Sequence, residues 1–465
     1  MLRVASHTDN VGPGSIYVAI PGEKTDGAQF VAQAIEQGAK MIVVQEDSPL
    51  LEICQQPCMN KGVCFKVVPD AREALAHLSA EAYAFPAKRL KLLGVTGTDG
   101  KTTSAYLLYH LLKTAGKKVA LLSGVENILD DKVEKALLTT SKPDFLHNFF
   151  HQCVQKDIEY VVMELSAQAE SFSRLNGLQF EGMIFTNLSP EHGEQYKTLE
   201  DYFATKCAIL SKKKKDAPLV VHPSSWVDKV RDRFNDVIFV GYEKGAGVQV
   251  TSLQESFEKQ VFEIKIGADW HQIESSLIGA YNLLNIAGAV ALVHQFGMTG
   301  AVIEKGLATF KGVPGRFERY QLRNGAWAVI DYAHTPQALE NVLPVLKKYA
   351  RELIVVTGAG GGKDIKKRAD MGKIAAQYAD RIILTNVDPR HENPQKIMDD
   401  IERDLTERQK LVIVREPMRS SAIKFACREA KPGDIVAILG KGHETTINMG
   451  AHIIQHNDSE AVFSL

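Results

Sequence analysis

Residues 92–112 read LLGVTGTDGKTTSAYLLYHLL and contain the pattern that decides the fold. The apolar run at 92–95 is typical of a buried strand, and apolar side chains at helical spacing follow from about Thr102. A strand that leads through glycines into a helix directs backbone N–H groups and the positive end of the helix dipole at an anion. We therefore predict a phosphate-binding loop made of Gly97, Thr98, Asp99, Gly100, Lys101, Thr102 and Thr103.

Two side chains of this loop have predicted roles. Lys101 should reach the terminal phosphates of a nucleotide, and the Thr102 hydroxyl should help to hold Mg²⁺. Val95 stands where the usual spacing of such loops has a glycine. We favour ATP over GTP, although the loop suits either nucleotide. Three classes of protein remain open from the loop alone: a kinase, a motor or switch ATPase, and a ligase that activates a carboxylate.

Strand-like apolar runs alternate with helical segments on both sides of the loop. We expect strands within 14–22 and 40–47, then within 117–123, 158–166 and 182–189, and finally within 327–333, 352–360, 381–388, 411–416 and 434–440. Such alternation indicates mostly parallel sheet. The sequence predicts an α/β protein of three consecutive domains, at 1–88, 89–313 and 314–465. The central domain should have a P-loop-type sheet and the last should be Rossmann-like.

Composition excludes several classes of partner. The chain of 465 residues has 55 basic and 56 acidic side chains, so no overall positive field favours nucleic acid or an anionic membrane. We see no apolar stretch of membrane-spanning length and no signal peptide at the start. Three of the six cysteines cluster at 54–64 without completing a zinc pattern, which favours reduced thiols. We expect a cytoplasmic monomer.

Further motifs narrow the function. They are VVMELSAQ (161–168), TNLSPEH (186–192), YFATK (202–206), LIGAYNLLN (277–285), GVPGRFERY (312–320), DYAHTPQALE (331–340) and LGKGHET (439–445). With the loop, their order and spacing resemble those of the Mur ligases over nearly the whole chain. The resemblance is closest to the MurE group, which adds the third peptide residue to a UDP-N-acetylmuramoyl dipeptide. It implies an ATP-dependent amide ligase of peptidoglycan precursor synthesis that works through an acyl phosphate.

The resemblance also implies a catalytic group. Two Mg²⁺ ions neutralise the reacting anions, and the ligands carried over are Thr102, Glu164, His192 and Lys206, the last as a carbamate. Together with Lys101, the last three are the expected catalytic residues. The position of Glu164 at the end of an apolar strand supports its role, because the carboxyl ends of parallel strands face the ligand. Carbamylation predicts dependence on CO₂ and loss of activity in Lys206→Ala.

Substrate contacts follow from the same resemblance. For ATP they are Asn282 and Asn285 at the adenine, Arg316 at the phosphates and Asp331 at the ribose. For the UDP-linked substrate they are Thr8, Thr139, Thr140, Ser166 and Arg174. For the incoming amino acid they are Arg368, Asp388, Arg390, Gly440 and Glu444. Because Arg316 and Asp331 belong to the third predicted domain, we expect that domain to complete the ATP site when it closes.

The stretch around Arg390 bears on the choice of amino acid. MurE ligases that use meso-diaminopimelate have Asp-Asn-Pro-Arg, whereas this chain has Val387-Asp388-Pro389-Arg390. A retained arginine can clamp a carboxylate through two hydrogen bonds, which favours meso-diaminopimelate over lysine. The segment expected to contact the UDP-linked substrate departs further from the MurE pattern, because this chain has His7-Thr8-Asp9 where those ligases have Asp-Ser-Arg.

Two alternatives stay open. One is a MurE-like paralogue that ligates another amine to a different carboxylate. The other, from a different class, is a P-loop small-molecule kinase. A kinase makes ADP without free phosphate, whereas a ligase releases phosphate only when both carboxylate and amine are present.

Overall fold

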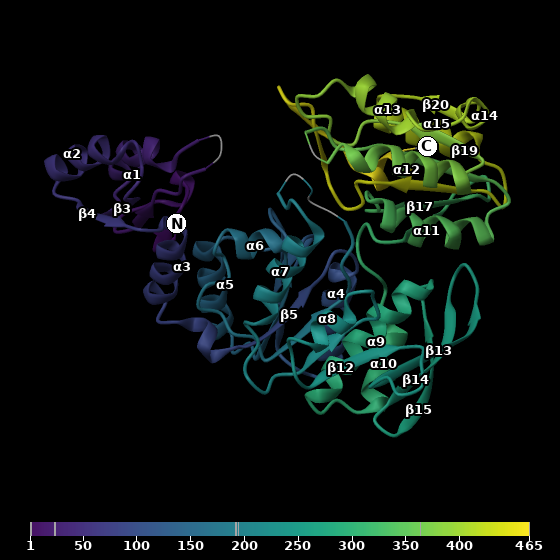
Figure 1. Ribbon diagram of the computed structural model, residues 1–465, viewed down its shortest axis with the longest axis horizontal. Coiled ribbons are helices and arrows are strands. Elements are labelled where there is room, and N and C mark those ends of the chain that lie inside the picture. The colour runs from purple at the N-terminus through teal and green to yellow at the C-terminus, as the bar shows by residue number, and fades with distance from the viewer. Residues whose placement is uncertain (1, 23–24, 191–192, 194, 363, 465) are drawn as a thin grey trace. The chain divides into compact units, whose positions relative to one another are not determined.

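The computed structural model describes residues 2–22, 25–190, 193, 195–362 and 364–464 (Figure 1). The chain forms two compact units. The first contains Met1–Gly97, Gly116–Phe185 and Ala204–Leu219, and the second contains Thr98–Ala115, Thr186–Phe203 and Val220–Leu465. Helix α7 (Leu199–Leu210) and strand β11 (Leu219–Val221) contribute residues to both. Both units mix helices with mostly parallel sheet, so the predicted α/β class is confirmed.

The first unit begins with a small parallel sheet. Its strands are β1 (Val4–Ala5), β2 (Ile16–Val18), β3 (Met41–Gln45) and β4 (Cys64–Val68), in that order. Alternate strand residues point to opposite faces. Helices α1 (Val31–Glu36) and α2 (Leu51–Lys61) bury one face and α3 (Ala71–Ala82) buries the other. All six cysteines of the chain are free thiols, as expected.

A second group of strands in the first unit leads to the predicted loop. The order is β10 (Gly182–Phe185), β5 (Lys91–Thr96), β9 (Tyr160–Leu165), β6 (Val119–Leu122), β7 (Glu126–Leu129) and β8 (Lys132–Lys135). The first four are parallel, and the last two are joined antiparallel. Helices α5 (Pro143–Gln155) and α6 (Ala167–Ser171) complete this part. Every residue of β9 and β10 is buried, which explains why both strands are apolar apart from Glu164.

The second unit starts with helices around the loop. Helix α4 (Lys101–Thr114) packs against α9 (Ala280–Gln295) and α10 (Gly300–Thr309). After α8 (Val227–Arg231) the chain forms β12 (Val237–Gly241), β13 (Val248–Glu255), β14 (Gln260–Ile266) and β15 (Asp269–Ser275). The last three form an antiparallel meander that the sequence analysis did not predict.

The C-terminal part of the second unit is a six-stranded sheet. Its order is β16 (Glu318–Gln321), β17 (Trp327–Asp331), β21 (Ile435–Leu439), β18 (Leu353–Thr357), β19 (Arg381–Leu384) and β20 (Ile413–Arg415). Only β16 is antiparallel among these described strands. Helices α11 (Pro336–Tyr349) and α12 (Lys366–Tyr378) bury one face, and α15 (Arg419–Glu429) and α16 (Asp458–Phe463) bury the other.

The remaining elements of this part are α13 (Pro394–Glu402), α14 (Glu407–Lys410) and a hairpin of β22 (Thr446–Asn448) and β23 (Ile453–Gln455). Among the helices of the described ranges, none is both long enough and apolar enough to cross a membrane.

A buried ion pair links α16 to α15, and we expect it to make the stability of the C-terminal part depend on pH in the acid range. Asp458 and Arg419 are both fully buried and share two hydrogen bonds of 2.7 Å. Burial raises the pKa of Asp458, but Arg419 and His456 outweigh it and lower the pKa from 3.8 to about 2. A lowered pKa stabilises the folded state above the pKa of the unfolded chain, so about 2 kcal/mol should be lost as the pH falls from 4 to 2.

Asp458→Asn should therefore lower the free energy of unfolding by about 3–5 kcal/mol at neutral pH, because it leaves Arg419 buried without its partner. Urea unfolding of the variant at several pH values measures both effects. Asp404→Asn is the matched control, since Asp404 pairs with Lys373 on the surface, and it should change little. Equal stability of Asp458→Asn and the unaltered chain would contradict this account.

Candidate active site

The phosphate-binding loop is held in place by the segment 186–189. Thr98 N–H donates to the Asn187 carbonyl at 3.0 Å, and Asp99 N–H donates to Asn187 Oδ1 at 2.9 Å. In turn Thr186 Oγ1 and Asn187 Nδ2 donate to the Asp99 carbonyl. Lys101 Nζ donates to the Thr98 carbonyl. The first half of the motif TNLSPEH thus shapes the loop, a role that the sequence analysis missed.

The loop needs a glycine where α4 begins. Gly100 has φ +82°, and a Cβ there would lie 2.4 Å from Asn285 Oδ1. Asn285 in turn donates to Asn282 Oδ1 at 3.2 Å, and Asn282 Nδ2 donates to the Ile278 carbonyl at 2.8 Å. The two asparagines of α9 are therefore oriented by a hydrogen-bond chain beside the loop, and both are buried.

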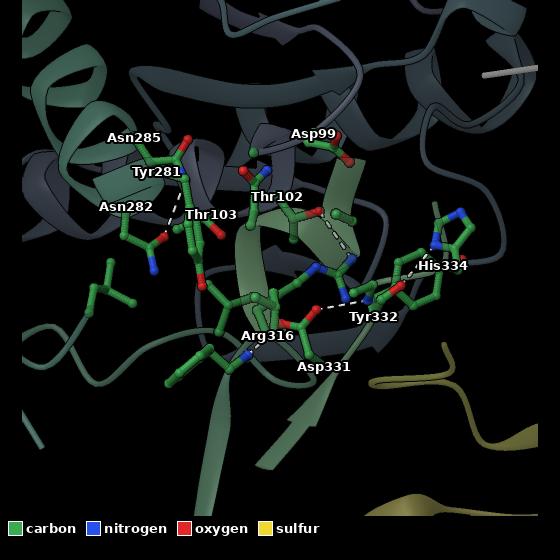
Figure 2. Close-up of a pocket in the computed structure, with 18 residues that line it drawn as sticks. Asp99, Thr102, Thr103, Tyr281, Asn282, Asn285, Arg316, Asp331, Tyr332 and His334 are labelled. Atoms are coloured by element: carbon green, nitrogen blue, oxygen red, sulfur yellow. Dashed lines mark hydrogen bonds between the residues drawn. The ribbon is translucent and has the colours of Figure 1, made fainter. Parts of the chain in front are cut away.

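A pocket joins the loop to several of the motifs (Figure 2). Of the predicted ATP residues, those that line it are Asp99, Gly100, Thr102, Thr103, Asn282, Asn285, Arg316 and Asp331. Figure 2 shows Arg316 directed toward Thr102, whose Oγ1 accepts from Arg316 Nη2 at 3.4 Å. Residues 214 positions apart in the chain thus meet in one cavity. Tyr281, Tyr332 and His334 also line it and were not predicted, although each lies inside a quoted motif.

Asp331 organises the C-terminal wall of the pocket. Its two oxygens accept from Phe317 N–H and Ala333 N–H, each at 2.7 Å. Burial is the largest influence and raises the pKa of Asp331 above its ordinary value, although Arg316 and these N–H groups act in the opposite direction. Arg316 also lies over the Tyr332 ring at 4.4 Å. The wall therefore offers a guanidinium and a carboxyl group side by side.

Glu164 lies near the carboxyl end of β9, and Lys206, in helix α7, reaches the carboxyl end of β5 with its Nζ. Each is 1% exposed. Glu164 Oε1 accepts from Gly124 N–H at 3.0 Å. Lys206 Nζ donates to the Gly97 carbonyl at 2.9 Å and to Thr96 Oγ1 at 3.3 Å. Because β5 and β9 are parallel neighbours, Glu164 and the Lys206 Nζ lie at the same edge of the sheet, and we call these two groups the strand-end cluster.

A metal could be held here by oxygen donors. Glu164 supplies a carboxylate, and a carbamate on Lys206 would supply a second one, which are the ligands that Mg²⁺ prefers. Within the described ranges, no three His, Cys, Asp or Glu side chains cluster as a metal site. His192, the remaining predicted ligand, lies outside the described residues.

The residues predicted for the UDP-linked substrate gather beside Glu164. Thr140 Oγ1 donates to the Glu164 carbonyl at 2.8 Å and accepts from Ser166 N–H at 3.0 Å. Arg174 Nη1 donates to the Thr140 carbonyl at 2.7 Å. A Cβ on Gly124 would lie 3.3 Å from Thr139 Oγ1, so Thr139 is close too.

Thr8 is tied to this region through its neighbour. Ser6 donates both its N–H and its hydroxyl to Asp144 Oδ2 at 2.8 Å, and Asp144 lies in the first turn of α5, shortly after Thr140. Thr8 itself is buried, in a short 3₁₀ turn. The turn is thereby anchored to the segment that carries the other predicted contacts.

Three of the predicted amino-acid contacts gather at the carboxyl ends of the C-terminal strands. Lys441, which is fully buried, donates to Asp388 at 3.1 Å and to Glu444 at 2.5 Å. Tyr332 Oη donates to Glu444 at 3.2 Å, and Gly440 N–H donates to the Asp331 carbonyl at 3.0 Å. Lys441 was not predicted, and it neutralises part of the charge that Asp388 and Glu444 offer to a ligand.

The two predicted arginines differ in what they can do. Arg368 is fully buried, and its guanidinium donates to both oxygens of Glu392, to Asp400 and to the Gly360 carbonyl. The hydrogen bond from Arg368 is the main reason that the pKa of Glu392 falls to about 2. Arg390 donates to the Gly361 carbonyl at 2.8 Å from a left-handed backbone, φ +53°. Arg368 therefore holds the loops through Glu392, and Arg390 is the one of the two without a carboxylate partner in the described structure.

Three family models match consecutive segments of the chain. They are the Mur ligase family catalytic domain at 6–83, the Mur ligase middle domain at 95–293 and the Mur ligase glutamate ligase domain at 315–442. A UDP-N-acetylmuramoyl-L-alanyl-D-glutamate–2,6-diaminopimelate ligase of Caldanaerobacter subterraneus subsp. tengcongensis is 32% identical over 97% of this chain and 91% of that protein. The chain belongs to the Mur ligase family. The members of this family are ATP-dependent amide ligases, as the motifs predicted.

A further relative and two solved structures are also similar to this Mur ligase over most of its length. An enzyme of the same name from Aquifex aeolicus is 34% identical over 95% of this chain and 88% of its own length. A solved 2,6-diaminopimelate ligase is 25% identical, with a TM-score of 0.64 over 99% of this chain and 93% of that one. MurF from Thermotoga maritima, solved with ADP, has a TM-score of 0.70 at 20% identity over 97% of this chain and 94% of its own, which shows the shared fold.

Proposed function

We propose that this Mur ligase joins meso-diaminopimelate to the D-glutamyl carboxylate of UDP-N-acetylmuramoyl-L-alanyl-D-glutamate, with ATP as the energy source. The observation that carries the proposal is the pocket of Figure 2, where the loop, α9 and two C-terminal motifs contribute Thr102, Asn285, Arg316 and Asp331 to one cavity. The names of the relatives from Caldanaerobacter and Aquifex support the substrates. ATP and UDP-linked sugars are intracellular metabolites, so we place the reaction in the cytoplasm. We propose that the enzyme acts there as a monomer.

Each part of the pocket has a proposed task. The adenine contacts Asn282 and Asn285, whose amides can both donate and accept. The ribose hydroxyls bind Asp331, and the phosphates bind the loop N–H groups, Lys101 and Arg316. The remaining loop residues Gly97, Thr98, Asp99, Gly100, Thr102 and Thr103 shape this cradle. Bound phosphate is thus surrounded by fixed donors, which stabilise the charge that develops during transfer.

The reaction brings the negatively charged phosphates and substrate carboxylate together, and we assign divalent cations to the strand-end cluster to neutralise this charge. We propose that Glu164, Thr102, His192 and a carbamate on Lys206 hold two Mg²⁺ ions, which would supply charge neutralisation to the phosphates and to the substrate carboxylate. The buried positions of Glu164 and Lys206 support this assignment. The residues themselves orient these groups and exclude water from an acyl phosphate that water would hydrolyse.

The two remaining substrates have proposed sites of their own. Thr8, Thr139, Thr140, Ser166 and Arg174 bind the UDP-linked dipeptide in the first unit. Asp388, Arg390, Gly440 and Glu444 bind the amino acid, Arg390 by its free donors to a carboxylate and Glu444 to an ammonium group. Arg368 supports this site through Glu392. Domain limits of 1–88, 89–313 and 314–465 fit these tasks, and the segments that the family models match support them.

One assay tests the reaction and the choice of amine. The purified protein is incubated with ATP, Mg²⁺, UDP-N-acetylmuramoyl-L-alanyl-D-glutamate and one amino acid at a time, and phosphate release and product mass are followed. We expect phosphate and an amide product with meso-diaminopimelate, and less than about a tenth of that rate with L-lysine, which lacks the second carboxylate of diaminopimelate that Arg390 is proposed to bind.

Two results would count against the proposal. ADP formation without free phosphate would favour the small-molecule kinase. No product with any amino acid, together with turnover of a different carboxylate, would favour a paralogue, an outcome that the substitution of Val387 for aspartate makes worth testing.

A further inference from the structure

Glu255, the last residue of β13, is bonded at both carboxylate oxygens although it does not line the pocket. Oε2 accepts from Gly279 N–H at 2.9 Å. Oε1 accepts from Tyr349 Oη at 2.8 Å and from Lys348 Nζ at 3.1 Å. The side chain is 17% exposed. Burial raises the pKa of Glu255, but these three donors outweigh burial, so the pKa lies below its ordinary value and the group is ionised.

The backbone donor belongs to one wall of the nucleotide pocket. Gly279 precedes α9 and has φ +93°, a conformation that favours glycine. A Cβ there would lie 2.8 Å from Cε1 of Tyr281. Tyr281 and Asn282, in the first turn of α9, lie along this wall (Figure 2). Glu255 therefore fixes the turn from which these two side chains project.

The side-chain donors belong to α11, a second helix that contributes residues to the pocket. Lys348 and Tyr349 end α11. The first half of the same helix contributes Ala338, Asn341 and Val342 to the pocket. Lys348 and Tyr349 lie about two turns beyond these residues in the same helix, so their bonds to Glu255 restrain the helix that carries the pocket residues. One carboxylate thus links α9, which carries the proposed adenine contacts, to α11, which lines the same pocket.

The turn after Glu255 reinforces the link. The Phe257 ring packs against Trp327 at 5.3 Å and against Tyr349 at 5.9 Å between centroids. Arg319 donates to the Phe257 carbonyl and, at 2.8 Å, to the Ser276 carbonyl. The tip of the β13–β14 hairpin is therefore held by β16, β17 and α11 together.

We propose that Glu255 is a positioning residue for nucleotide binding, which sets the spacing of α9 and α11 without touching the nucleotide. The inference rests on the proposed nucleotide pocket and goes beyond it, because it assigns to the antiparallel hairpin a task in nucleotide affinity. The physical reason is that only an ionised carboxylate can accept from all three donors at once. An amide has one accepting oxygen, and its NH₂ group would face a donor.

Glu255→Gln tests the proposal, because it keeps the size of the side chain. Titration calorimetry of the full chain with ADP should give a dissociation constant about tenfold higher than that of the unaltered protein. The Michaelis constant for ATP should rise by the same factor, while the constant for the UDP-linked substrate stays within about twofold. Glu274→Gln is the matched control, because Glu274 lies on β15 of the same meander, is 57% exposed and pairs with Lys259 at 2.7 Å. This variant should bind ADP normally.

A double variant separates positioning from general damage. Tyr349→Phe removes one donor to Glu255, and the Glu255→Gln/Tyr349→Phe protein should bind ADP no more weakly than Glu255→Gln alone, because both changes break one link. Normal ADP binding by Glu255→Gln, an equal loss for ADP and the UDP-linked substrate, or additive effects would each overturn the inference. Failure of the unaltered protein to bind ADP would instead remove the proposed nucleotide site.

Discussion

Lys206→Ala is expected to lower the rate of amide formation by about 10³-fold, because it removes a group from the centre where negative charge develops. Lys206 is buried and donates to the Gly97 carbonyl, so the substitution removes a group that is held in a fixed position. The rate should fall equally whether Lys206 acts as an ammonium group or as a carbamate. The two forms can be distinguished by whether an added anion or an added cation restores activity to the variant.

Small ions of either charge can be added to Lys206→Ala to test which form of the lysine is active. If the lysine acts as a carbamate, acetate should restore part of the rate and ethylammonium should not. Depletion of CO₂ should also slow the unaltered enzyme, with recovery on addition of bicarbonate. Lys214→Ala is the matched control, since Lys214 is an exposed lysine of the neighbouring loop paired with Glu181, and its rate should be unchanged. Rescue by ethylammonium alone would show that the cation is needed.

Glu164→Gln is expected to lower kcat by about 10²–10³-fold and to raise the Mg²⁺ concentration needed for half-maximal rate. The amide oxygen can still accept from Gly124 N–H, so the local structure should persist and the change is mainly the loss of a charge. Circular dichroism and the melting temperature check the fold. Steady-state rates over a range of Mg²⁺ concentrations check the function.

The control for this variant is Glu134→Gln, on the exposed strand β8 of the same sheet. It should have the Mg²⁺ dependence of the unaltered enzyme. Unchanged Mg²⁺ dependence in Glu164→Gln, with an unchanged rate, would exclude Glu164 as a metal ligand.

Some features of this Mur ligase could be predicted from short stretches of its sequence. The loop at 97–103, the buried strand that precedes it and the helix that follows were predicted because glycine positions and apolar spacing act over a few residues. The α/β class followed from the same alternation, and the motifs carried the family. The meander β13–β15 was missed because its apolar alternation is regular only in β14, where every second residue is buried.

The amino-acid sequence was therefore enough to predict the α/β class, the strand–loop–helix unit around residues 97–103 and the family to which the chain belongs. The pairing of distant side chains became visible only in the folded chain: Asp388 with Lys441, Arg368 with Glu392, and Glu255 with Tyr349, a pair 94 positions apart. The physical reason is that hydrogen bonds and ion pairs of this kind form between surfaces that the packing of sheets and helices brings together. Their partners leave no periodic signal in the chain, whereas strands, turns and helix starts depend on neighbours that the sequence places side by side.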